Sequence, residues 1–189
     1  MNTEFKQWYD AFFDEAESHI FKTSHFQSPM SEEVPEMDEL EERIAELSAE
    51  GHFVSINPMM HRAKACHENQ EEINKILIDF DEQRDDWTMD FPYTYALDTA
   101  GKGRHYVIIL SESISLFKWK DLSRKMSIKY GADTQAASAM FTRIPNGYRG
   151  FNQQLIVDFP GNIVNVQTIE KLCAGQRIRE PGHVAWNTP

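Results

Sequence analysis

Residues 76–82 read Ile-Leu-Ile-Asp-Phe-Asp-Glu, and this stretch is the strongest single feature of the sequence. Its apolar start predicts a buried strand. The strand ends in Asp79 and Asp81, which point to the same side because side chains alternate along a strand. Two adjacent carboxylates repel each other unless a cation lies between them, and Mg²⁺ or Mn²⁺ prefers such oxygen ligands. The stretch predicts a metal site; the alternative is a strand that leads into an acidic surface loop.

The pattern on both sides of this strand predicts further strands and helices. Gly131 is expected to end the main helix, and Asp133 is expected to N-cap a short one. The chain from residue 51 onward therefore predicts an α/β (α+β) domain with a mostly antiparallel sheet. The expected strands are 52–56, 73–80, 93–97 and 105–110 with a late pair at 155–157 and 163–164, and the expected helices are 118–130, 133–140 and 167–173.

The first 50 residues predict two acidic helices. Apolar residues from Phe5 to Ile20 recur at helical spacing, and a second apolar stripe runs from Met37 to Leu47 before Gly51. Their acids are expected to form a solvated face, with a partner-docking surface or a shield against nucleic acid as the alternative. We expect three parts: an acidic helical segment at 1–50, a catalytic core at 51–175, and a tail at 176–189.

The net charge of −11 argues at first against a nucleic-acid partner, but its distribution reverses this impression. Residues 1–50 hold 14 acids and 3 bases, so they account for the whole net charge. Residues 102–149 hold 9 bases and 3 acids. Within them, the basic stretch Lys118–Lys129 is expected to follow a nucleic-acid backbone.

Composition and length narrow the class of protein. The 189 residues, 41% hydrophobic, are enough for one domain with a sizeable core. No apolar run reaches the roughly 18 residues of a membrane span. The start lacks the pattern of a signal peptide, and two cysteines exclude a disulfide framework. We expect a soluble protein of a reducing compartment, with no membrane partner.

Residues 98–106, Asp-Thr-Ala-Gly-Lys-Gly-Arg-His-Tyr, form a second candidate motif. The two glycines allow a tight turn, and amides and cations beside them could surround a polyphosphate. The stretch lacks the third glycine of the dinucleotide fingerprint and the Lys-Ser/Thr ending of the P-loop. A basic hairpin turn is the alternative. The candidate phosphate contacts are Gly101, Lys102, Gly103, Arg104 and His105.

The order of the motifs resembles the catalytic core of the archaeo-eukaryotic primase superfamily, especially the primase-polymerases of plasmids and viruses. That family has D-x-D/E, then S-G-x-G-x-H-x-Y, then an Asp upstream of R-x-P-G. Here D-x-D precedes G-x-G-x-H, Asp133, and Arg143-Ile-Pro, and the resemblance covers Phe53 to Gly150. Two positions depart from the family pattern, because Ala100 replaces the serine and Asn146 displaces the last glycine.

The resemblance implies an RRM-like palm and a template-directed nucleotidyltransferase, a DNA primase, a DNA polymerase or both, in the replication of a virus or mobile element. It makes Asp79, Asp81 and Asp133 the catalytic ligands of Mg²⁺ or Mn²⁺. His105 would contact the phosphates of the incoming nucleotide, with Arg143 and the glycine turn nearby. The implied partners are a single-stranded DNA template, nucleoside triphosphates, and a helicase or other replication protein. The implied location is the cytoplasm of a prokaryotic or virus-infected host cell.

Two other functions remain open at the level of sequence. The first is a catalytically inactive relative that binds nucleotide or DNA in a replication complex. The second is a metal phosphohydrolase that uses the D-x-D. Aspartyl-phosphate hydrolases expect Thr or Val in the last position of D-x-D-x-T/V, where this chain has Gln83. Two purely structural interpretations also stay open: Asp133 as the N-cap of a helix, and Arg143 as a surface arginine.

Overall fold

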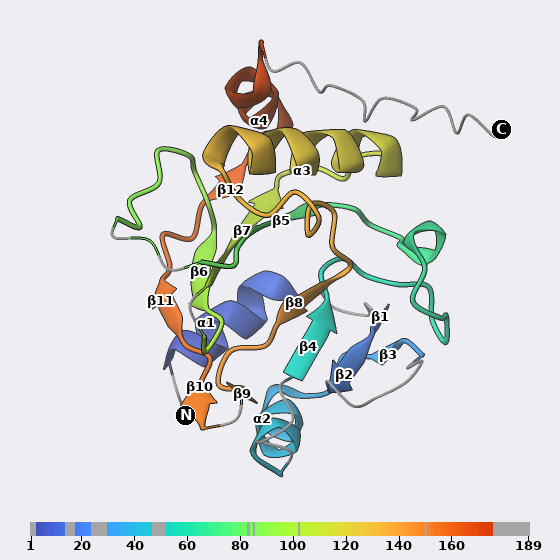
Figure 1. Ribbon diagram of the computed structural model, residues 1–189. Coiled ribbons are helices and arrows are strands. Elements are labelled where there is room, and N and C mark those ends of the chain that lie inside the picture. Colours follow the sequence, from blue (N-terminus) through green and yellow to red (C-terminus); the bar gives the residue numbers. More distant parts are fainter. Residues whose placement is uncertain are drawn as a thin grey trace, which may run out of the picture.

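The computed structural model describes residues 3–13, 18–23, 30–46, 52–82, 84, 86–101, 103–149 and 151–175 (Figure 1). Its α-helices are α1 (Thr3–Phe12), α2 (Met37–Glu46), α3 (Leu116–Tyr130) and α4 (Val166–Cys173), with a 3₁₀ turn at His67–Asn69. Its strands are β1 (Ser18–His19), β2 (Phe21–Thr23), β3 (Glu32–Glu33), β4 (His52–Ser55), β5 (Lys75–Phe80), β6 (Tyr95–Asp98), β7 (Arg104–Leu110), β8 (Phe141–Arg143), β9 (Tyr148–Arg149), β10 (Asn152–Gln153), β11 (Ile156–Asp158) and β12 (Ile163–Val164).

The main sheet is built around β7. Strand β5 pairs with it antiparallel along its whole length, from Lys75 opposite Ile109 to Phe80 opposite Arg104. Strand β6 pairs antiparallel with the other edge of β7, and β11 pairs antiparallel with β6. Strand β12 pairs parallel with the end of β7. The late strands were expected as a pair, but each joins a different strand of this sheet. The expected α+β class with a mostly antiparallel sheet is confirmed.

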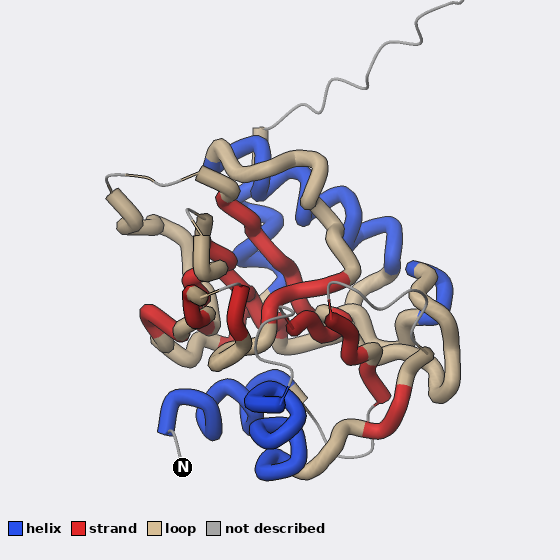
Figure 2. Tube along the Cα trace, turned by 60° about the horizontal axis from the view of Figure 1, so that its bottom comes forward, coloured by secondary structure: helices blue, strands red, loops and turns tan. Residues whose placement is uncertain are grey.

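Two layers cover the main sheet, one on each face (Figures 1 and 2). Helices α3 and α4 lie on one face, where Trp119 donates its indole N–H to the carbonyl of Lys75 at 2.8 Å. Helix α1 and a second, three-stranded sheet of order β2-β4-β8 lie on the other face. The fully buried rings of Phe5, Trp8 and Phe12 join α1 to the common core. Helix α1 of the acidic segment therefore packs on the core of the domain.

The helix predicted from Phe5 to Ile20 is too long. Helix α1 ends at Phe12, and Ser18 and His19 instead form β1 opposite β3. The amide of Ile20 donates to the hydroxyl of Ser55 at 3.0 Å, and its carbonyl accepts from the amide of Ser55 at 2.9 Å. Apolar spacing continued through this segment, but pairing with β4 determined its conformation, which local sequence does not reveal. The second predicted helix is confirmed as α2, and Gly51 lies outside the described residues.

Local signals identified α3 correctly. Ser115 caps its start by accepting a hydrogen bond from the amide of Lys118. Gly131 ends it in the left-handed conformation, with φ of 67°. The short helix expected from Asp133 to Met140 is absent, and those residues form turns, with Ser138 at a φ of 64°. No helix in the described part of the chain is long and apolar enough to cross a membrane.

Candidate active site

The pairing of β5 with β7 brings Asp79 and His105 together. The two residues lie opposite each other in the ladder, so their side chains share one face of the sheet. His105 Nε2 lies 3.3 Å from Asp79 Oδ1, with the histidine buried and the aspartate partly exposed. Both side chains point to the face that carries the three-stranded sheet, away from α3.

The second ring nitrogen of His105 is held by Thr142. Its Nδ1 lies 3.1 Å from Thr142 Oγ1, and both residues are buried. Thr142 comes from the middle of β8, so this contact connects the two sheets behind the carboxylates. It fixes the plane of the imidazole and leaves Nε2 directed at Asp79. Sequence reasoning missed Thr142, because no strand was predicted at residues 141–143.

Asp133 reaches the same place from the turn after α3. Its backbone amide donates to the carbonyl oxygen of Asp79 at 2.8 Å, beside the outer edge of β5. Its carboxylate accepts from the amide of Gln135 at 2.7 Å, as an N-cap residue would, although no helix follows. The opposite end of that edge is held by Asn57, which accepts from the amide of Lys75 at 2.8 Å. The Asn57 carboxamide and Asp133 thus cover the edge of the strand that carries the acids.

The three carboxylates lie close enough to influence one another. The negative charge of Asp79 raises the pKa of the Asp81 carboxyl, and burial and the neighbouring Asp133 add to the rise. The charge of His105 acts in the opposite direction. This is the electrostatic signature of a crowded anionic site, and a bound cation would relieve the repulsion.

The carboxylates of this site suit a divalent metal by their chemistry. No group of three His, Cys, Asp or Glu side chains in the described residues is already arranged around a common point as a metal site. The donors themselves are carboxylate oxygens, which are the ligands that Mg²⁺ and Mn²⁺ prefer. Their repulsion, seen in the raised pKa of Asp81, is of the kind that such a cation relieves. The donor chemistry therefore fits, and side-chain adjustment would complete the coordination.

The glycine turn lies beside the acids, and its second glycine is required by packing. A Cβ on Gly103 would lie 2.2 Å from the carbonyl oxygen of Phe80 and 3.2 Å from the Cα of Asp81. Only glycine allows the hairpin to come this close to the end of β5. Thr99 closes the turn by donating its hydroxyl to the carbonyl of Gly103 at 3.1 Å, and Ala100 has a φ of 57°. Gly101 is exposed in this turn, and Lys102 lies outside the described residues.

Two predicted cations do not point at the carboxylates. Arg104 lies on the face of β7 opposite to His105, because side chains alternate along a strand. Its guanidinium carbon lies 4.4 Å from the centre of the Trp87 ring. Arg143 lies on the opposite face of β8 from Thr142, with its guanidinium carbon 3.8 Å from the Phe53 ring. Their proposed contacts to nucleotide stay predictions. The structure joins Asp79, Asp81, Asp133 and His105, and places these two arginines on neighbouring surfaces.

A cavity of about 330 Å³ opens next to Asp81 and Asp133. Arg84 also lines it and supplies the positive charge among its lining residues. The Arg84 guanidinium stacks over the Phe80 ring at 4.8 Å and donates to the carbonyl of Tyr130 at 3.4 Å. Sequence reasoning missed Arg84, because it stands in an acidic loop without a motif.

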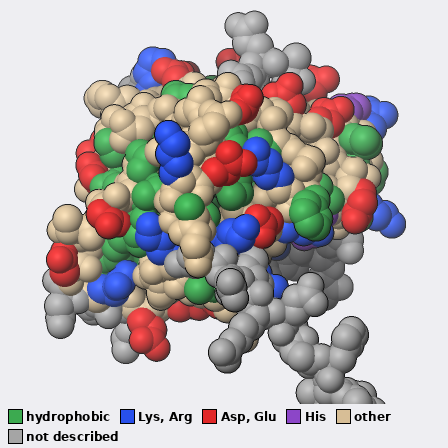
Figure 3. All heavy atoms as spheres, turned by 90° about the horizontal axis from the view of Figure 1, so that it is seen from above, with side chains coloured by type: hydrophobic (Ala, Val, Ile, Leu, Met, Phe, Trp, Pro, Cys, Tyr) green, Lys and Arg blue, Asp and Glu red, His purple; other side chains and the backbone are tan. Residues whose placement is uncertain are grey.

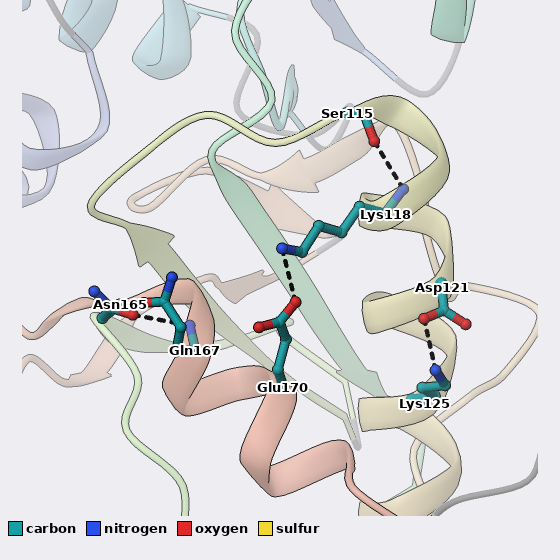
Figure 4. Close-up of polar contacts among 7 residues, drawn as sticks. All are labelled: Ser115, Lys118, Asp121, Lys125, Asn165, Gln167 and Glu170. Carbon is teal, nitrogen blue, oxygen red and sulfur yellow. Dashed lines mark hydrogen bonds and ion pairs between the residues drawn. The ribbon is translucent and has the colours of Figure 1, made fainter.

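The basic stretch in α3 is largely engaged within the protein (Figure 4). Lys118 pairs with Glu170 of α4 at 2.7 Å, and Lys125 pairs with Asp121 at 2.7 Å. Lys129 donates to the carbonyl of Leu172 at 2.8 Å. Seen from the side of α3 and α4, basic and acidic side chains alternate and do not form one basic patch (Figure 3). This helix also covers the sheet face away from Asp79 and His105, so the structure does not favour it as the path of a template.

Comparison with known proteins gives a match in structure and none in sequence. No protein-family model and no curated protein matches the chain. The AEP domain of the cyanophage S-2L primase-polymerase superimposes with a TM-score of 0.70 at 11% identity, covering 90% of this chain and 96% of that domain. This chain has the AEP fold. This fold is the one that the resemblance of the motifs implied.

Two further solved structures are similar to this chain. The catalytic domain of primase RepB′ in complex with initiator DNA has a TM-score of 0.63 at 12% identity, with 89% of this chain and 90% of that one covered. A crystal structure of primase RepB′ has a TM-score of 0.59 at 12% identity, and the match spans 60% of that chain. At these identities the comparison shows the shared fold.

Proposed function

We propose that this protein is a metal-dependent, template-directed nucleotidyltransferase that acts as a primase, a DNA polymerase or both in replication of a virus or mobile element. The observation that carries the proposal is the meeting of Asp79, Asp81 and Asp133 beside His105 within an AEP fold. These residues belong to three separate motifs of the sequence. The order of these motifs along the chain resembles that of the primase superfamily.

The three aspartates would hold Mg²⁺ or Mn²⁺. When bound, a pair of such cations stabilises the attacking 3′-oxygen and the leaving pyrophosphate. Asp79 is presented by the rigid β5–β7 ladder, whereas Asp133 is fixed by its own amide, which donates to the Asp79 carbonyl. The site is thus oriented by backbone pairing, which is the support that precise catalytic geometry needs.

His105 is placed to exchange one partner for another. Its Nε2 faces Asp79 at 3.3 Å, and a cation on Asp79 would compete for the same carboxylate. Nε2 would then be available to donate a hydrogen bond to a phosphate of the incoming nucleotide. Thr142 keeps the ring oriented during this exchange because it holds Nδ1. Arg84, on the wall of the adjoining cavity, would balance charge on the polyphosphate.

Primer extension on a single-stranded DNA template tests the proposal. With Mn²⁺ or Mg²⁺, the protein should incorporate nucleotides, and Asp79→Asn or Asp81→Asn should abolish incorporation. Asp86→Asn is the matched control, because Asp86 is an exposed acid in the loop that follows the same strand. Full activity of both site variants would refute the assignment, and equal loss in the Asp86 variant would show that general loop disruption was measured.

A catalytically inactive, nucleotide- or DNA-binding relative is the second candidate. The contact of His105 with Asp79, which engages one of the proposed metal ligands, favours it. It predicts nucleotide or DNA binding without incorporation in either metal. A wild-type protein that extends primers excludes this candidate.

A further inference from the structure

The three-stranded sheet has an outer surface that mixes cations and aromatic rings. Lys22, Phe53 and Arg143 are direct neighbours across β2, β4 and β8, so their side chains share one face. Phe141 lies two residues before Arg143 and points the same way. All four are partly exposed. We call these four residues the cation–aromatic face.

The contacts within this face are close and specific. The Arg143 guanidinium carbon lies 3.8 Å from the centre of the Phe53 ring, within stacking distance. Lys22 Nζ lies 3.9 Å from the centre of the Phe141 ring and 5.3 Å from that of Phe53. Burial, and then the charge of Arg143, lower the pKa of Lys22. Two cationic side chains are thus held beside two rings on one face of the sheet.

We propose that the cation–aromatic face binds a single strand of nucleic acid. Bases stack on phenyl rings and on arginine planes, and phosphates pair with cations, which are the two kinds of group gathered here. A contact between a partly exposed lysine and a ring is weak, so Lys22 can leave Phe141 for a phosphate while a base takes its place. Duplex DNA cannot use the rings because its bases are already stacked.

The face lies close to the carboxylates through β8. Thr142 lies between Phe141 and Arg143 in β8, and its side chain points to the opposite face of that strand. There it contacts His105, which in turn contacts Asp79. Strand β8 is an edge strand in the order β2-β4-β8. A nucleic-acid strand on the outer face therefore needs only to pass the edge of β8 to reach the acids. That this nucleic-acid strand is the template rests on the proposed function. The binding of a single strand to the face does not.

Binding of single-stranded DNA without nucleotide or divalent metal tests this inference. Fluorescence anisotropy of a labelled oligonucleotide of about 15 nucleotides, near the upper end of site sizes for single-strand-binding folds, gives the affinity. Phe141→Leu should weaken binding by about 5-fold to 100-fold, the loss expected for one stacked base. Lys22→Gln should weaken it less and reduce the salt dependence by about 0.7 in log–log slope, as expected for one lost phosphate contact.

Matched controls separate this face from general effects. Lys6→Gln removes one positive charge from an exposed lysine paired with Asp10, and Phe117→Leu removes a ring that is 84% exposed on α3. Both should bind as the wild type does. A melting curve of each variant confirms folding, and Lys22→Gln tests the face without altering an apolar contact with the core.

The outcomes distinguish this inference from the proposed function. Unchanged affinity and salt slope in both face variants, or a wild type that does not bind the oligonucleotide, would overturn the inference whatever the result of primer extension. Binding that depends on Phe141 and Lys22 but persists in Asp79→Asn supports it, even if the protein incorporates no nucleotide. Equal dependence on Phe141 for a blunt duplex would also overturn it, because a duplex offers no free base.

Discussion

Gly103→Ala tests how closely the glycine turn and the catalytic acids depend on each other. The added Cβ would lie 2.2 Å from the Phe80 carbonyl oxygen, where carbon contacts normally settle near about 3.5 Å. The neighbour is backbone in a paired strand, so no side chain can rotate to make room. The hairpin or the end of β5 must therefore move by roughly 1 Å.

Two effects of different size are expected from this displacement. Overpacking of this kind costs about 1–3 kcal/mol of unfolding free energy, which lowers Tm by roughly 3–10 °C in a chain of this length. Asp81 follows Phe80 directly, and a misplacement of about 1 Å at a catalytic group costs about 100-fold in rate. The variant should therefore lose most of its nucleotide incorporation while it remains folded.

Thermal melting and primer extension, measured on the same preparation, give both quantities. Gly131→Ala is the control, because a Cβ there meets no atom within 4 Å and the substitution is strained only by its φ of 67°. It should lower Tm while leaving most of the activity. A Gly103→Ala protein with wild-type Tm and wild-type activity would show that the close approach to β5 is not required, and the reasoning would fail.

Three further predictions concern the acids and the histidine. Because the pKa of Asp81 is raised in the folded state, its contribution to stability is lost as pH rises; Asp81→Asn should therefore raise Tm at neutral pH without divalent metal, with the gain shrinking towards about pH 4. Mn²⁺ at about 100 times its Kd should stabilise the wild type by about 2.7 kcal/mol, and Asp79→Asn should remove that gain in a thermal-shift titration. Thr142→Val should destabilise the fold by about 1–3 kcal/mol in urea, because it leaves the buried Nδ1 of His105 without its partner, whereas Thr142→Ser should not.

The sequence predicted best where local signals and tertiary contacts agree. Strand β5 is a short apolar run ending in acids, and α3 has a periodic apolar stripe and a terminal glycine, so each needs no distant partner to be recognised. The meeting of Asp79 with Asp133 depended on the resemblance to a family. Spacing along the chain does not show that the amide of Asp133 pairs with the carbonyl of Asp79.

Other features could not be read from sequence because a distant strand decides them. The segment around Ile20 has helical apolar spacing but pairs with Ser55. The alternation along β8 sends Thr142 to His105 and Arg143 to the other side, and only knowledge of which face is inward assigns them. Because side chains alternate along a strand, Arg104 and His105 are neighbours in sequence but lie on opposite faces of β7.

The acidic segment shows why charge must be assigned by position in the fold. Of its three basic residues, Lys6 pairs with Asp10 and Arg43 pairs with Glu32, whereas Lys22 belongs to the cation–aromatic face. The same segment supplies the buried rings of α1, so removing residues 1–50 would expose part of the core and delete part of that face together. Truncation therefore cannot test whether the acids shield nucleic acid. Replacing exposed glutamates of α2 by glutamine preserves the core and Lys22, so it isolates the effect of charge.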